Sequence, residues 1–146
     1  MLRKRLLGVI GLLLLVPLAY AGKSLVFATS DGAIRGHDPV AYFTEGKPTK
    51  GSDQYAFEWN GEEFKFTSAE NRDLFKANPE KYAPQYGGYC AYAVSRGYTA
   101  STVPEAWSII DDKLYLNYSL DVRKRWQRDI PGNIGKANNN WPGVLN

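Results

Sequence analysis

The chain has 146 residues, with 18 Lys and Arg against 15 Asp and Glu, and a single cysteine. Charges of both signs are mixed along the chain, which excludes the one-sided basic surface typical of nucleic-acid-binding proteins. One cysteine excludes an internal disulfide, so the fold must depend on an apolar core. Aromatic residues make up 14% of the chain, which is enough for such a core in one domain of ordinary size.

The first 21 residues have the pattern of a secretory signal peptide. Basic residues at positions 3–5 precede an apolar run over residues 6–18, and Ala19-Tyr20-Ala21 forms a cleavage site. The run is shorter than the roughly 20 residues that a membrane-spanning helix needs. We therefore predict cleavage after Ala21, a periplasmic or secreted protein of residues 22–146, and no membrane span after cleavage. Loss of the three basic residues leaves 15 basic against 15 acidic side chains.

The mature part is predicted to have an α+β fold, with small antiparallel β-hairpins packed against short helices in a single domain. Residues 24–29 are expected to form a short strand. Asp38 followed by Pro39 is typical of a helix start, with the aspartate as N-cap and the proline in the first turn. This helix is expected to end near Gly46.

A hairpin and a longer helix are predicted next. Aromatic residues alternate with other residues over 55–59, which is the period of a half-buried strand. Asn60-Gly61 is a strong signal for a tight turn. The Thr-Ser-Ala-Glu sequence over residues 67–70 has the pattern of a capping box, and it predicts a helix with Leu74 and Phe75 facing the core.

The rest of the chain is predicted to contain short helices, a second hairpin and a C-terminal helix capped by Ser119. The composition beyond Ile130 is rich in Gly and Asn, which predicts an irregular tail. The sequence shows no internal repeat and no linker. The expected divisions are a motif core at about 36–94, a hairpin and helix at 104–130, with strands over 107–110 and 114–118, and a tail at 131–146.

Several motifs occur in a fixed order along nearly the whole mature chain. They are Gly36-His37-Asp38-Pro39-Val40-Ala41-Tyr42-Phe43, Trp59-Asn60-Gly61, Phe66-Thr67-Ser68-Ala69-Glu70-Asn71, Phe75, Asn78-Pro79-Glu80-Lys81-Tyr82, Tyr86-Gly87-Gly88-Tyr89-Cys90-Ala91, Leu114-Tyr115-Leu116-Asn117-Tyr118 and Trp141-Pro142. In this order the motifs resemble those of exported YHS-domain proteins.

The resemblance implies a small α+β module of a kind often found near metal-handling proteins, such as copper-transporting pumps. The metal-associated members carry cysteines at three positions that here hold Ala41, Thr67, and Asn71 or a neighbour of it. A thiolate cluster for a soft metal cannot form from one cysteine, so the usual ligand set of these members is missing.

His37, Asp38 and Cys90 are the candidate metal ligands. An imidazole and a thiolate are ligands for copper or zinc, and the Asp38 carboxylate or a tyrosine oxygen is available to complete such a site. Each residue also has a simpler interpretation. His37 then bonds to backbone near a turn, Asp38 only caps its helix, and Cys90 is a buried, inert thiol. A Cys–His nucleophilic pair is the third alternative, but no orienting residue or oxyanion motif accompanies it.

Tyr42, Tyr86 and Tyr89 are the candidate residues for a small ligand or a protein partner. Tyr82, Tyr86 and Tyr89 belong to a tyrosine-rich segment around Gly87-Gly88. Packing in the core, with the hydroxyl groups bonded to backbone, is the alternative interpretation.

The sequence therefore predicts a secreted, non-catalytic binding module, with a copper- or zinc-class ion as the first candidate ligand. The alternative is a metal-free module that binds a small ligand or a protein through the tyrosine-rich segment. An enzyme or redox protein that depends on Cys90 ranks last. A homodimer is compatible with either form of binding, and nucleic acid is not an expected partner.

Overall fold

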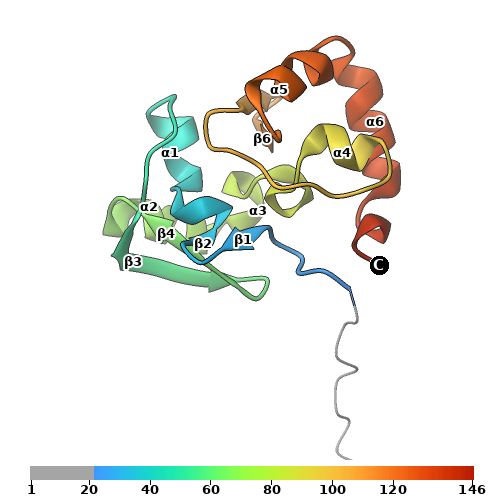
Figure 1. Ribbon diagram of the computed structural model, residues 1–146. Helices are drawn as coiled ribbons and strands as arrows, with labels where there is room; N and C mark the ends of the chain where they lie inside the picture. The colour runs from blue at the N-terminus through green and yellow to red at the C-terminus, as the bar shows by residue number, and fades with distance from the viewer. Residues whose placement is uncertain (1–21) are drawn as a thin grey trace, which may run out of the picture.

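Hairpins and short helices alternate along residues 22–146, which are the residues that this computed structural model describes (Figure 1). The predicted signal peptide lies outside them. The fold is α+β, as predicted, with three two-stranded antiparallel sheets. The sheets are β1 (Ala28–Thr29) with β2 (Gly32–Ala33), β3 (Ser52–Trp59) with β4 (Glu62–Phe66), and β5 (Trp107–Ile110) with β6 (Lys113–Leu116).

Six α-helices and three 3-10 turns complete this part of the chain. None of these helices is long and apolar enough to span a membrane. The helices are α1 (Pro39–Thr44), α2 (Ala69–Ala77), α3 (Pro79–Tyr82), α4 (Ala91–Ser95), α5 (Leu120–Gln127) and α6 (Ile130–Asn140), and the 3-10 turns are η1 (Ile34–Gly36), η2 (Gln85–Gly88) and η3 (Gly143–Leu145).

The β3–β4 hairpin forms where the sequence predicts it. Asn60 and Gly61 both have positive φ, at 50° and 83°, as a two-residue hairpin turn requires. Phe64 and Phe66 on β4 are fully buried. The Phe75 ring of α2 lies 4.9 Å and 5.2 Å from theirs, so the hairpin and α2 share one aromatic core.

The start of α2 differs from the prediction by one residue. Ser68, not Thr67, caps the helix by accepting a hydrogen bond from the Asn71 backbone N–H. Phe75 is fully buried as expected, but Leu74 is 37% exposed. With the cap moved by one residue, Thr67 is available for a different contact.

The expected strand over residues 24–29 is mostly extended chain. Only its last two residues form β1. The preceding residues run alongside η2 instead, and the Phe27 N–H donates to the Gly87 carbonyl over 2.9 Å. A β-branched, apolar composition does not distinguish these two extended arrangements.

The predicted tail is wrong, because most of it forms α6. Asp129 caps this helix by accepting from the Gly132 N–H. The Asn133 and Asn140 side chains donate to the carbonyls of Trp126 and Val94, over 2.9 Å and 2.8 Å. The asparagines that suggested an irregular tail therefore fix α6 against its neighbours.

The same order of elements occurs twice. The first unit, residues 33–82, runs η1, α1, β3, β4, α2, α3, and the second unit, residues 85–140, runs η2, α4, β5, β6, α5, α6. In Figure 1 the first unit occupies the blue-to-green side and the second the yellow-to-red side. No repeat is visible in the sequence, so the correspondence lies in the order of the elements.

Backbone geometry supports this correspondence. Three successive residues have positive φ in each unit, 44°, 58° and 71° over residues 34–36, and 57°, 62° and 84° over residues 86–88. The backbone angles of the N-cap residue of the last helix also match between the two units. Asn78, before α3, has φ −151° and ψ 73°, and Asp129, before α6, has φ −150° and ψ 75°. Both units thus follow one backbone plan with different side chains.

Gly87 gives a direct test of how η2 packs. It has φ +62°, and a Cβ there would collide with the Leu25 carbonyl oxygen. We expect Gly87→Ala to lower the free energy of unfolding by about 3 kcal/mol or more, as measured by urea denaturation. Gly46→Ala is the matched control, because Gly46 also has positive φ, +68°, but has open space around it. Its cost should be about 1 kcal/mol, and equal costs at both positions would contradict the packing.

Candidate functional site

Asp38 lies at the centre of a buried hydrogen-bond network. Its side chain is 0% exposed. One carboxylate oxygen accepts from the N–H groups of Val40 and Ala41, over 2.8 Å and 3.2 Å. The other accepts from the Thr67 N–H, the Thr67 hydroxyl and the Asn71 side-chain amide, over 2.8 Å, 2.9 Å and 2.9 Å. We call these five residues the Asp38 hub.

The hub lies where the family resemblance would place a metal site. Ala41, Thr67 and Asn71, which stand in the positions of the missing cysteines, all belong to it. They supply a methyl group, a hydroxyl group and an amide instead of thiolates. Because Asp38 already accepts five hydrogen bonds, neither of its oxygens faces an open coordination position. These residues do not fit a metal ion.

His37 lies directly before the hub without a bond to the Asp38 side chain. Its Nδ1 is 3.1 Å from the Arg35 carbonyl oxygen, and its backbone forms an isolated antiparallel bridge with Lys50. These contacts are those of a histidine that stabilises a turn through hydrogen bonds with the backbone.

Cys90 has the surroundings of a structural cysteine. It is the N-cap residue of α4 and is 1% exposed. Its Sγ accepts from the Tyr118 N–H over 3.3 Å and lies 3.5 Å from the Asn117 Oδ1. Burial raises the pKa of the thiol, and nearby backbone N–H groups offset this only in part. A nucleophilic cysteine needs a lowered pKa, so this environment disfavours the thiolate.

The three candidate ligands are not gathered into one site. Across residues 22–146, no group of three or more His, Cys, Asp and Glu side chains is placed to hold a metal ion. His37 and Asp38 stand at the start of α1, and Cys90 stands at the start of α4, each with its own partners.

Tyr42, Tyr86 and Tyr89 are packed, with 1%, 5% and 8% of their surface exposed. Their hydroxyl groups donate to the Pro104 carbonyl, the Asn138 side chain and the Ser24 carbonyl, over 2.9 Å, 2.9 Å and 2.7 Å. Burial raises the pKa of all three hydroxyl groups above its usual value. Tyr86 also lines a cavity.

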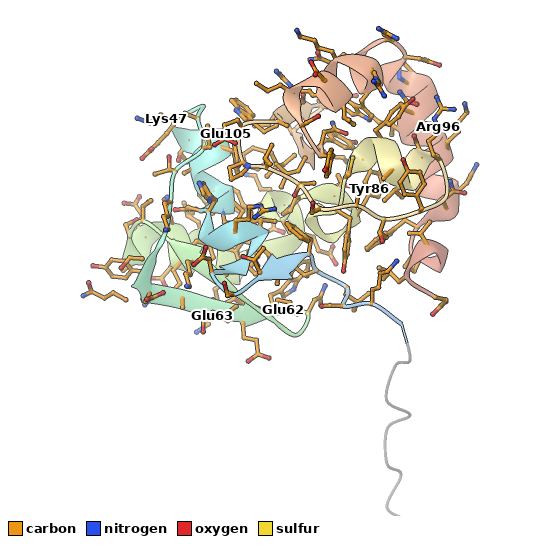
Figure 2. The ribbon with its side chains drawn as sticks, viewed as in Figure 1. Lys47, Glu62, Glu63, Tyr86, Arg96 and Glu105 are labelled. Atoms are coloured by element: carbon orange, nitrogen blue, oxygen red, sulfur yellow. The ribbon has the colours of Figure 1, made fainter. Side chains whose placement is uncertain are left out.

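That cavity has a volume of about 540 Å³ and lies where the two units meet. We call it the interunit cleft. The β3–β4 turn, the α3–η2 segment and the end of α6 form its walls, and Tyr86 is labelled in Figure 2. Its lining includes the aromatic residues Trp59, Tyr86 and Trp141, the amides Asn60, Gln85 and Asn138, and Glu80.

The cleft combines aromatic surface with one charge. Glu80 is the only charged side chain in its lining. The Tyr86 ring lies 6.1 Å from the Trp141 ring, and its hydroxyl group is bonded to Asn138. Of the cleft lining, only Tyr86 was among the candidate residues predicted from the sequence, because the cleft needs α6, which was predicted as a tail. The Trp141-Pro142 motif was the one signal that this part of the chain carries a specific structure.

The hub predicts that substitution of Asp38 lowers the free energy of unfolding much more than substitution of an exposed aspartate does. Asp38→Asn keeps the shape but turns an acceptor into a donor that faces other donors. We expect it to lower the free energy of unfolding by about 3 kcal/mol, as measured by chemical denaturation. Asp73→Asn is the control, because this exposed residue of α2 pairs only with neighbouring Arg72, and its cost should stay within about 0.5 kcal/mol. Similar costs for the two variants would contradict the hub.

Part of the chain matches a known protein family. Residues 40–86 match the family model for the YHS domain, a span that runs from α1 into η2 and so falls almost entirely in the first unit. No curated protein and no solved structure matches the chain. Residues 40–86 therefore form a YHS domain, in agreement with the motifs of the first unit.

Proposed function

We propose that the protein is an exported, non-catalytic binding module that holds a small organic cation in the interunit cleft. The observation that carries this proposal is the lining of the cleft, where three aromatic rings surround a space with one carboxylate and no basic side chain. A YHS domain is compatible with a binding role of this kind.

The size and lining of the cleft favour a small molecule. Ligand sites usually have volumes of about 300–1,000 Å³, mostly apolar walls and a few polar groups that fix orientation. The cleft, at about 540 Å³, lies within this range. Its amides from Asn60, Gln85 and Asn138 supply donors and acceptors on different walls.

The charge of the lining favours a cation over an anion. Faces of Trp and Tyr attract an ammonium group through their quadrupole, by about 0.5–2 kcal/mol. Glu80 adds a carboxylate, and no side chain of the lining would neutralise it. Tyr86 is held by Asn138, so at least one wall is preorganised before the ligand binds.

Copper or zinc binding is the hypothesis that the geometry supports less. It needs His37, Asp38 and Cys90 in one coordination sphere, and their hydrogen bonds lie with three separate sets of partners. Protein binding through the tyrosine-rich segment is also less supported, because Tyr86 and Tyr89 are buried.

The place of action follows from the sequence of the first 21 residues. The basic start, the apolar run and the Ala-Tyr-Ala site support export and cleavage after Ala21. We therefore propose that the binding takes place in the periplasm or outside the cell.

Choline tests the cation hypothesis against its neutral isostere, 3,3-dimethylbutanol. We expect choline to bind more tightly than the alcohol in isothermal titration. Glu80→Gln should weaken choline binding by about fivefold, since a near-surface charge contact is worth about 1 kcal/mol. The same substitution should leave binding of the alcohol unchanged.

Glu105→Gln is the matched control, because Glu105 is exposed and does not line the cleft. It should leave choline binding unchanged. Equal affinity for choline and the alcohol, or equal effects of the two substitutions, would overturn the assignment of a cation. Failure of both compounds to perturb Trp59 and Trp141 in NMR spectra would overturn the cleft as a site.

A further inference from the structure

The second unit has a counterpart of the Asp38 hub with different chemistry. Cys90 occupies the N-cap position of α4 as Asp38 does that of α1, but the first-turn N–H of Tyr92 donates to the Asn117 side chain and not to Cys90. The Tyr118 N–H donates to the Cys90 Sγ as the Thr67 N–H donates to the Asp38 carboxylate. Thr67 and Tyr118 each stand directly before the serine that caps the next helix. The two sites are therefore equivalent positions of one backbone plan.

The side chains that close the first site are missing from the second. In the first unit, Asn71 stands three residues after its cap serine and donates to Asp38. In the second unit, Val122 occupies the same position relative to Ser119 and has no polar group to offer. A pocket of about 250 Å³ lies here, with Cys90 and Val122 in its lining. We call it the α4–α5 pocket.

The remaining lining of this pocket is aromatic and basic. Tyr92, Tyr98 and Tyr118 line it together with Arg125, and no acidic side chain does. Tyr98 and Tyr118 are 54% and 53% exposed, so they belong to the few large apolar side chains that the described part of the chain leaves in solvent.

The two arginines near this pocket differ in their contacts. Arg96 donates to the Tyr92 hydroxyl over 2.9 Å, and its guanidinium lies 4.9 Å from the centre of that ring. Figure 2 shows Arg96 at the outer edge of the second unit. Arg125 has no ion pair or side-chain hydrogen bond within residues 22–146. The Arg96 guanidinium thus holds Tyr92 in place, whereas the Arg125 guanidinium is available to a ligand.

We infer that the α4–α5 pocket is a second binding site, and that it takes a single-ring organic carboxylate. A volume of about 250 Å³ lies below the usual range for larger ligands, which favours one ring. Tyrosine rings stack against an aromatic ligand, and a guanidinium binds a carboxylate through two parallel hydrogen bonds. This inference uses no residue of the interunit cleft and is independent of the proposed function.

Benzoate is the probe, with benzyl alcohol as its neutral counterpart. In NMR titrations of the protein, benzoate should shift the backbone signals of Tyr98, Tyr118 and Val122 in a saturable way, and benzyl alcohol should bind at least about fivefold more weakly. Arg125→Gln should weaken benzoate binding at least about fivefold. Arg128→Gln, on the same helix but outside the pocket lining, should leave it unchanged.

Val122→Asn gives a second, independent test, because it places an asparagine, as at Asn71 in the first unit, at the equivalent position of the second unit. It should weaken benzoate and benzyl alcohol alike, by filling and polarising the pocket, while the thermal unfolding midpoint shows that the variant is folded. Equal losses for Arg125→Gln and Arg128→Gln would mean general attraction of anions and would overturn the inference. Absence of a saturable shift in the wild type, or a Val122→Asn variant that binds benzoate normally, would also overturn it.

Discussion

The first unit depends on one buried carboxylate. Asp38 accepts hydrogen bonds from the first turn of α1 and from the residues that start α2. The first turn of α1 thereby presents backbone N–H groups to this negative charge, which the helix dipole stabilises, and the residues around the α2 cap add three further donors. The β4 strand ends at Phe66, directly before Thr67, so the same contact also fixes where the hairpin leaves the core. Without it, α1, the hairpin and α2 would lack their common anchor.

Duplication of this plan explains where the cavities lie. The second unit keeps the cap positions and the left-handed turn before them, but a thiol replaces the carboxylate. A carboxylate needs several donors when it is buried, whereas a thiol needs few, so Val122 can stand where Asn71 stands in the first unit. The first site is thus closed by polar groups, and the second is left open. The interunit cleft has a separate origin, since it forms between the two units.

Local elements could be predicted from the sequence because short-range chemistry determines them. The Asp38-Pro39 start, the Asn60-Gly61 turn and the Ser119 cap are all present. The prediction of an irregular tail was wrong, because tertiary contacts of Asn133 and Asn140 stabilise α6. Helix propensity does not reveal such contacts. The single His and the single Cys were chosen because these residue types are rare in the chain, and the density of tyrosines identified Tyr86 but not the cleft. The duplication was missed because the units share backbone angles rather than residues.

Metal uptake distinguishes a closed Asp38 hub from a metal site. The positions of the missing cysteines are closed by hydrogen bonds to Asp38, and His37 and Cys90 contact separate turns. Protein purified without chelators would be dialysed against micromolar zinc or copper, and its bound metal would be measured by mass spectrometry. We expect uptake well below one ion per chain, unchanged by His37→Ala or Cys90→Ser. One ion per chain, lost in both variants, would contradict the account.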